Sequence, residues 1–199
     1  MKNLLFLLFL ISFNLNAQYK FTPADTYYLD VNLSKLVFKE INDFRSKINR
    51  KPYVWSDFWY KSANRWSEHL AKTSTWGHCN FENFNGQEMI VPIQIGPGTI
   101  NYDSVAKEAV KQWYESPFHQ FKIVCPLMQK PGDHAIGLRN NVMVDMYVSK
   151  YLGISAYVYD LGEKYNHYKQ VRIVWQSGYF IDKDEPISKY SLTITDPLE

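Results

Sequence analysis

The sequence has few cysteines, no long hydrophobic run and no marked excess of charge of one sign. Two cysteines in 199 residues allow at most one internal disulfide. No stretch reaches the about 20 consecutive apolar residues that a membrane-spanning helix needs. The net charge is only +2, without a run of Lys or Arg, which argues against nucleic acid or an anionic membrane as the main partner.

Residues 1–17 have the pattern of a signal peptide. Lys2 supplies the positive charge, residues 4–13 form a short apolar run, and Ala17 is a small residue suited to the end of such a peptide. The run is about half the length that spans a bilayer, so the alternative of an uncleaved membrane anchor is less favoured. No cysteine follows it, which disfavours a lipid anchor. We therefore expect an exported protein in the periplasm, at the cell surface or outside the cell, which is not an integral membrane protein after cleavage.

Cys79 and Cys125 form the one candidate disulfide. An exported chain meets an oxidising compartment, where a bond between them would restrict the unfolded chain. Two buried thiols are the alternative, because the sequence does not show whether the two Cβ atoms approach each other.

Hydrophobic periodicity predicts three amphipathic helices before residue 117. Each begins near a residue type that commonly caps helices, and the first ends before Pro52. The predicted starts are Asn32 for the first helix, Ser56 or Asp57 for the second, and Asp103 or Ser104 for the third. The predicted apolar faces are Leu33, Val37, Ile41, Phe44 and Ile48; Trp59, Ala63, Trp66 and Leu70; and Ala106, Ala109, Val110 and Trp113.

Ser116 and Pro117 end the third helix and start a new turn. Proline lacks a backbone donor and clashes inside a helix, whereas serine is a good N-cap and proline is favoured at the first helical position. We therefore expect His119 in the first turn of a second, short helix, where this stop and restart fix its position.

After Pro131 the pattern changes to the alternation that is typical of strands. The expected strands are two within 134–148 around a turn at Asn140–Asn141, and others at 153–160, 171–175 and 190–196. Residues 18–31 and 77–102 show no sustained period and are expected to be irregular, and the second of these is long enough to suggest a functional loop. Helices followed by strands predict an α+β fold.

Two of the five histidines, His78 and His119, flank the longer irregular stretch, and Glu82, Glu88 and Glu115 lie in or near it. Imidazole and carboxylate groups together suit Zn²⁺ and other borderline divalent cations, and they equally suit a general acid–base pair without a metal. The spacing matches no compact motif such as H-E-x-x-H. The residue types in this stretch therefore suggest a metal site or an acid–base site. The spacing between these residues does not match a known motif and so does not identify which.

Several pieces of the sequence, in this order, resemble the CAP superfamily (cysteine-rich secretory proteins, antigen 5 and pathogenesis-related 1 proteins, also called the SCP domain), in its bacterial branch. The pieces are INDFRSKINRKPYVWSDFWYKSANRWSEHLA, GHCNF, NGQEMI, VAKEAVKQWYESPFHQFKIV and AIGLRNN. The resemblance covers residues 33–160. It implies an α-β-α sandwich with a central antiparallel sheet, and a cleft lined by two histidines and two acidic residues that binds a divalent cation such as zinc in some members.

His78 and His119 match the two family histidines. Gln87 aligns with the first family acid, and a shift of one residue puts Glu88 there instead. Glu115 lies two residues after Trp113, whereas the family acid usually lies three after. On a helix that offset turns a side chain by about 100°, so Glu115 is expected to reach the cleft less directly or not at all.

The resemblance divides the chain into a signal peptide (1–17), a lead-in segment (18–32), a CAP-like domain (33–160) and a β-rich C-terminal extension (161–199) of extra strands. The first functional hypothesis is a non-catalytic protein that binds a lipid-like ligand, a divalent cation or a protein partner at the cleft. The second is a metal-assisted hydrolase, in which His78 and His119 hold the metal and Glu88 or Glu115 activates water. The third is a stable scaffold in which the two histidines have only a structural role.

Overall fold

The computed structural model describes residues 23–80, 86–117, 119–124, 135–139, 142–178 and 180–182. The signal peptide, Glu82, Cys125 and the strand expected at 190–196 lie outside these residues. In chain order the elements are β1 (Thr26–Leu29), α2 (Val31–Lys47), β2 (Val54–Trp55), α3 (Asp57–Thr73), β3 (Gln87–Gly96), α4 (Tyr102–Glu115), α5 (Gln120–Val124), β4 (Ala135–Arg139), β5 (Val142–Val148), β6 (Tyr151–Asp160), η2 (Glu163–Tyr165), β7 (Lys169–Ser177) and β8 (Phe180–Asp182). No helix in the described ranges is long and apolar enough to cross a membrane.

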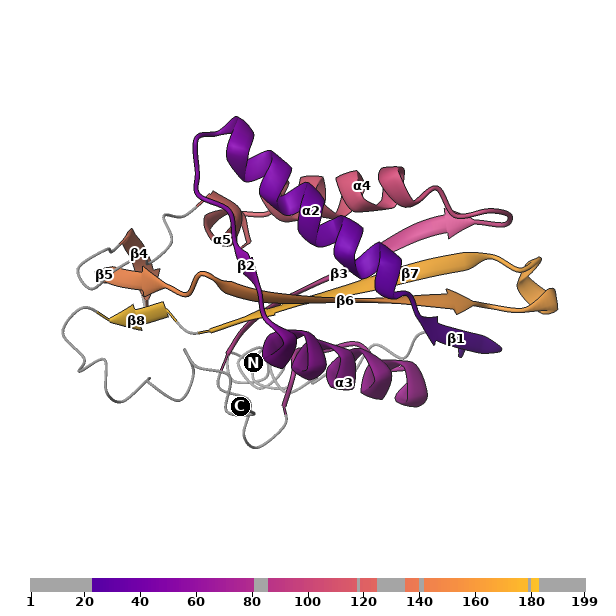
Figure 1. The fold of residues 1–199 in the computed structure, drawn as a ribbon. Helices are drawn as coiled ribbons and strands as arrows, with labels where there is room; N and C mark the ends of the chain where they lie inside the picture. The colour runs from indigo at the N-terminus through magenta and orange to yellow at the C-terminus, as the bar shows by residue number, and fades with distance from the viewer. Residues whose placement is uncertain are drawn as a thin grey trace, which may run out of the picture.

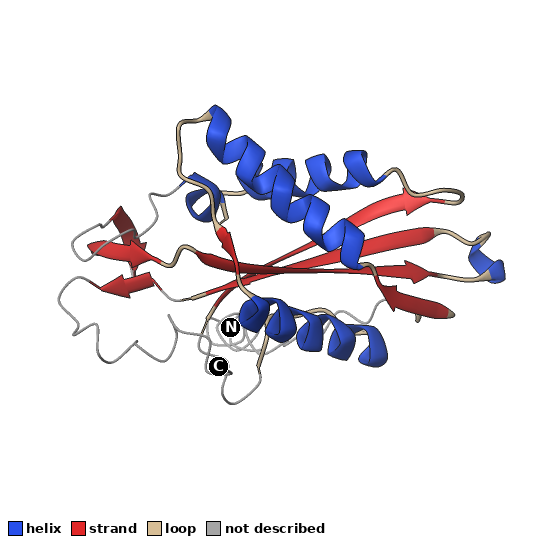
Figure 2. Ribbon diagram, in the orientation of Figure 1, coloured by secondary structure: helices blue, strands red, loops and turns tan. Residues whose placement is uncertain are grey.

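One sheet with helices on both faces forms the body of the protein (Figures 1 and 2). Its strands are ordered β1-β6-β7-β3 with antiparallel neighbours, and the short β2 pairs with β6 in parallel. Helices α2, α4 and α5 lie on one face and α3 lies on the other. The predicted α-β-α sandwich with a central antiparallel sheet is therefore confirmed. A second sheet, β4-β5-β8, lies at one end.

The face of the sheet below α2 and α4 carries a continuous apolar core. Trp175 of β7 stands at its centre, with its ring edge-to-face against Trp113 of α4 and against Tyr53. Both helices and strands contribute buried side chains to this core. The strands do so through alternate residues, which point to the same face of the sheet. The buried core residues include Leu33, Val37, Ile41, Met89, Val91, Ile93, Ala106, Ala109, Val110, Trp113, Ile154, Ala156, Val158, Val171, Ile173 and Trp175. This set contains the predicted apolar faces of α4 and of the first three turns of α2.

The face below α3 is more polar. Its apolar part is a smaller cluster of Ala63, Trp66, Leu70, Ile90 and Val174. Between these residues and the ends of the sheet lie the buried polar side chains Glu88, Ser155, Gln170, Arg172 and Gln176. Burying a polar group costs free energy unless it is hydrogen-bonded. The polar side chains on this face therefore need hydrogen-bond partners within the protein.

Helix α2 begins two residues earlier than predicted, with Asp30 and not Asn32 as its N-cap. The Asp30 side chain accepts a hydrogen bond from the amide of Leu33 at 2.9 Å. Its other carboxylate oxygen accepts from the hydroxyl of Tyr102 at the start of α4. The cap therefore also ties the starts of two helices together, and the sequence did not indicate that long-range contact.

Helix α4 likewise begins earlier than predicted, because Asn101 caps it and accepts from the amide of Ser104 at 3.0 Å. Neither Asp103 nor Ser104 is the start. Three residues with capping side chains stand within four positions here, and local preference alone does not choose among them. The prediction that Ser56 caps α3 is confirmed.

Both segments that were expected to be irregular contain strands of the sheet. β1 lies in the lead-in, and the ten-residue β3 lies in the predicted long loop. β3 is buried on both faces over much of its length, so its sequence does not alternate. Pro92 within it also argued against a strand, yet β3 is an edge strand, where a missing donor is tolerated.

Part of the predicted C-terminal extension belongs to the central sheet. β7 (Lys169–Ser177) lies between β6 and β3, so it is an internal strand and is not added at an edge. The strands expected at 153–160 and 171–175 correspond to β6 and β7. The hairpin expected within 134–148 is also present, as β4 and β5 pair in antiparallel register from Arg139 and Val142 outward.

Gly153 of β6 sets the distance between the sheet and α3. A Cβ atom at this position would lie 2.0 Å from the Tyr60 nitrogen and 2.1 Å from the Trp59 carbonyl carbon. These are backbone atoms of the first turn of α3. A change of side-chain rotamer therefore cannot relieve the clash, and the helix itself would have to move.

We predict that Gly153→Ala lowers the free energy of unfolding by about 3 kcal/mol, because α3 must move away from the sheet. The measurement is chemical denaturation of both proteins. Gly77→Ala is the matched control, since a Cβ there meets no atom within 4 Å. Equal stability of the Gly153 variant and the unmutated protein would show that α3 does not pack this closely.

Candidate functional site

The candidate site lies at the start of β3, the edge strand of the sheet. Glu88 points to the α3 face, as does Ile90 two residues along, and its side chain is only 3% exposed. Across the strand pair its neighbour is Gln176 of β7. Gln87 is only partly buried and, by the alternation of a strand, points to the other face. Of the two alternative acid positions, Glu88 is the one directed at the α3 face.

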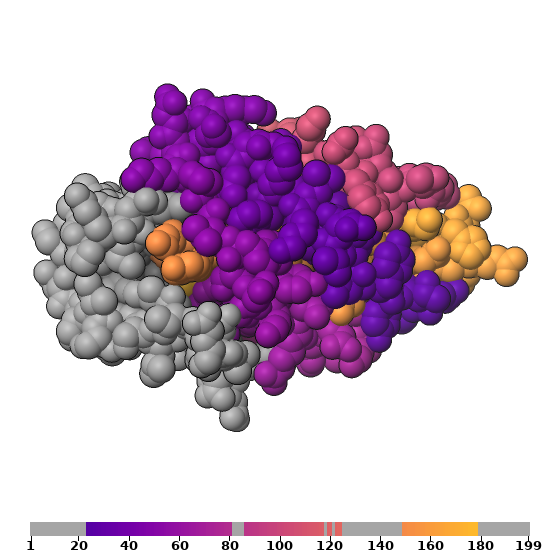
Figure 3. Space-filling model, viewed as in Figure 1, coloured from indigo at the N-terminus to yellow at the C-terminus, as the bar shows by residue number. Residues whose placement is uncertain are grey.

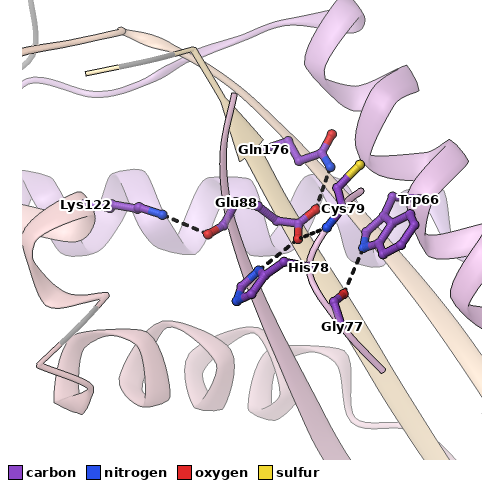
Figure 4. Close-up of polar contacts among 7 residues, drawn as sticks. All are labelled: Trp66, Gly77, His78, Cys79, Glu88, Lys122 and Gln176. Carbon is purple, nitrogen blue, oxygen red and sulfur yellow. Dashed lines mark hydrogen bonds and ion pairs between the residues drawn. The ribbon is translucent and has the colours of Figure 1, made fainter. Parts of the chain in front are cut away.

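Three donors surround the Glu88 carboxylate (Figure 4). One oxygen accepts from the Nδ1 atom of His78 at 3.0 Å and from the backbone amide of Cys79 at 2.9 Å. The other accepts from the Gln176 side-chain amide at 2.7 Å. A buried carboxylate is stable only with such partners, so the three donors and Glu88 depend on one another.

The segment 75–79 that carries His78 belongs to no helix and no strand. Its backbone is held at alternate residues by side chains. Arg172 donates to the carbonyl of Thr75 at 3.3 Å, Trp66 donates to the carbonyl of Gly77 at 3.1 Å, and the Cys79 amide donates to Glu88. Side chains of α3, β3 and β7 therefore hold the backbone of this segment in place.

This anchoring leaves the His78 ring largely in solvent, with 71% of its side chain exposed. A carboxylate can only accept a hydrogen bond, so the bond to Glu88 places a proton on Nδ1. In the neutral ring, Nε2 then carries the free lone pair. His78 is therefore oriented by Glu88 and presents a ligand atom outward.

His119 comes from the other layer of the sandwich. It lies in the turn between α4 and α5, where its amide and that of Gln120 both donate to the carbonyl of Ser116. Helix α5 begins at Gln120, so the prediction that His119 lies within its first turn is wrong by one residue. The predicted stop and restart at Ser116 is present in the backbone. Burial lowers the pKa of His119, and the charges of Lys122 and His78 lower it further. The ring is thus neutral at physiological pH and within electrostatic reach of His78.

Lys122, in the short helix α5, connects the two layers. Its ammonium donates to the backbone carbonyl of Glu88 at 2.8 Å. That carbonyl lies on the outer edge of β3, which has no strand neighbour among the described strands. The lysine therefore satisfies an edge carbonyl, and its charge is close enough to His119 to affect the pKa of that ring.

The remaining candidates lie apart from this group. Glu115 is the last residue of α4 and is exposed. The donors that surround the Glu88 carboxylate are His78, Cys79 and Gln176, so Glu115 is not part of this hydrogen-bonded group. The proposed disulfide involves Cys125, which is outside the described residues, and it stays a prediction. Cys79 packs beside the small apolar cluster under α3.

Sequence reasoning missed Lys122, Gln176, Arg172 and Trp66. The first two contact Glu88, and the other two hold the segment that carries His78. These residues lie up to 97 positions away in the chain from the groups that they contact. Only the pairing of the strands brings them together. Lys122 alone carried a local signal, since it follows His119 by three residues, about one helical turn.

The types of donor atom in this group are those that zinc sites use. Two imidazoles are suitable ligands, and a carboxylate behind one of them is the usual partner of a metal-bound histidine. Within the ranges that the structure describes, no group of three His, Cys, Asp or Glu side chains is arranged to hold a metal. A cation here would therefore have two protein ligands and positions open to solvent or to a ligand.

Comparison with known proteins supports the resemblance drawn from the sequence. Residues 38–171 match the cysteine-rich secretory protein family, CAP. No curated protein matches the chain. Among solved structures, an outer surface protein from Borrelia burgdorferi is similar, with 14% identity and a TM-score of 0.45 over 77% of this chain and 100% of that chain. The family match spans more than half of the 199 residues and includes His78, Glu88 and His119. The chain therefore belongs to the cysteine-rich secretory protein (CAP) family.

Proposed function

We propose that this chain is an exported binding protein whose cleft holds a divalent cation, with zinc as the best fit, between His78 and His119. The observation that carries the proposal is the Glu88–His78 pair. A buried carboxylate on Nδ1 fixes the tautomer and the ring plane, so that Nε2 faces outward. Export rests on the pattern of residues 1–17 alone, and N-terminal sequencing of the mature protein tests it.

His119 completes the site from the opposite layer. Its lowered pKa keeps the ring neutral, and a neutral ring is the form that binds a metal. Two protein ligands are fewer than the three that usually hold catalytic zinc, so we expect weak binding with exchangeable positions. A bound cation would supply an electrophilic centre for a ligand atom.

The metal-assisted hydrolase is less well supported by the geometry. A general base needs a carboxylate that reaches the water it activates. Both Glu88 oxygens already accept hydrogen bonds and its side chain is 3% exposed. Glu115, the other candidate base, is exposed at the end of α4 and is not among the hydrogen-bond partners of the Glu88–His78 pair. A lipid-like ligand and a protein partner stay predictions from the family resemblance.

We predict saturable zinc binding with one site per chain, measured by titration calorimetry on the mature protein. His78→Ala combined with His119→Ala is expected to abolish it, because both protein ligands are lost. His167→Ala is the matched control, since His167 also pairs with a carboxylate, Asp160, at 3.2 Å but lies in the β6–β7 turn. Absence of zinc binding by the unmutated protein would rule out the cation site.

We predict that Glu88→Gln lowers zinc affinity about tenfold, because the amide no longer polarises and orients His78 as a carboxylate does. The same substitution is expected to cost about 1–2 kcal/mol of stability through weaker hydrogen bonds to three donors. Calorimetric titration and thermal unfolding measure the two effects. A stability loss with unchanged zinc affinity would instead support the third hypothesis, that the cluster is structural.

A further inference from the structure

Three polar side-chain atoms of α3 and β6 have no hydrogen-bond partner among the described residues. They are Oδ1 of Asn64, Oγ of Ser67 and Oγ of Ser155. Ser67 and Ser155 are 1% and 0% exposed, and the Asn64 oxygen is buried although its residue is partly exposed. A buried polar atom without a partner loses the hydrogen bonds that water gives it in the unfolded chain, so each of the three needs a partner.

Contacts at the two ends of α3 place the middle of this helix over Ser155. Near the start of the helix, the backbone nitrogen of Tyr60 would lie 2.0 Å from a Cβ atom on Gly153. Near its end, Ala71 packs with Tyr157. Ser155 lies midway between these two contacts on β6 and points to the same face of the sheet, because alternate residues of a strand share a face. It is about 7 Å along the strand from Gly153, a rise that α3 covers in about four to five residues.

Asn64 and Ser67 lie on the side of α3 that contacts β6. Asn64 follows Tyr60 by four residues. Ser67 precedes Ala71 by four residues. Residues four apart share a face of a helix, so both side chains belong to the row that the two end contacts place against β6.

The position of β7 under the same helix agrees with this arrangement. Val174 of β7 is paired with Ser155 of β6. Val174 packs against the neighbouring row of α3, which consists of Ala63, Trp66 and Leu70. The two rows of helix residues therefore lie over the two paired strands, and the three unpaired oxygen atoms lie in the same part of the interface.

We propose that Asn64, Ser67 and Ser155 bind one buried water molecule between α3 and β6. The amide oxygen only accepts hydrogen bonds, whereas each hydroxyl both donates and accepts. One water that donates to Asn64 and to one serine, and accepts from the other serine, satisfies all three atoms. Buried waters typically make about three such bonds.

This water site gives α3 a polar attachment to the sheet beside its apolar one. Hydrogen bonds depend on distance and angle more steeply than apolar contacts do, so a bridging water fixes how far α3 slides along β6. The residue before Ser67 is Trp66, which holds the carbonyl of Gly77. The site is separate from the proposed cation site, and its failure would leave that proposal unchanged.

The first test is a crystal structure of the mature protein at a resolution that shows ordered solvent. We expect one water within about 2.7–3.2 Å of Oδ1 of Asn64 and of both serine hydroxyls. A water that contacts fewer than three of these atoms, or serine side chains that rotate to bond backbone carbonyls without a water, would overturn the inference.

The second test is a double-mutant cycle in solution, measured by chemical denaturation. Ser67→Ala and Ser155→Ala are each expected to raise the unfolding equilibrium constant about fivefold. The double variant is expected to show less than the product of the two effects, because both hydroxyls share one water. Ser62→Ala, a partly exposed serine of the same helix, is the matched control, and its effect is expected to multiply with that of Ser155→Ala. Independent, multiplying effects of Ser67→Ala and Ser155→Ala would contradict a shared water.

Discussion

The site depends on one buried carboxylate at the edge of the sheet. Glu88 is nearly inaccessible to solvent, and removing an ionised group from water is costly unless hydrogen bonds replace the hydration. The replacement comes from His78, the Cys79 amide and Gln176. The same three contacts determine where the segment 75–79 runs and which nitrogen of His78 faces outward. The need to hydrogen-bond the buried Glu88 carboxylate therefore also determines where Nε2 of His78, the proposed ligand atom, points.

The two faces of the sheet have different roles in stability and in positioning the site. The α2 and α4 side holds the continuous apolar core and can supply most of the stability, because burial of apolar surface is the dominant favourable term in folding. The α3 side can then carry Arg172, Gln176 and Glu88, whose hydrogen bonds specify positions more than they stabilise. The space-filling view shows the helices covering most of the face seen there, with the β6–β7 end of the sheet emerging beside them (Figure 3). The site lies at the start of β3, where Lys122 of α5 and the segment 75–79 both contact Glu88.

The sequence predicted what depends on local pattern. Helical periodicity located the helices, the serine–proline pair located His119, and the family resemblance selected His78 and His119 from five histidines. It failed where a contact is long-range. β3 was missed because burial on both faces removes alternation, and the choice between Gln87 and Glu88 needed the strand register. Arg172, at the middle of a strand that was first placed outside the domain, had no local signal for a role 97 residues away.

Glu88 holds His78 as the tautomer with its proton on Nδ1. The most direct measurement is the pair of imidazole nitrogen shifts of His78, from long-range ¹H–¹⁵N NMR spectra recorded above the pH at which the ring is protonated. We predict a protonated Nδ1 and an unprotonated Nε2, with the Nε2 shift changing on addition of zinc. A proton on Nε2, or a rapid average of the two tautomers, would contradict it.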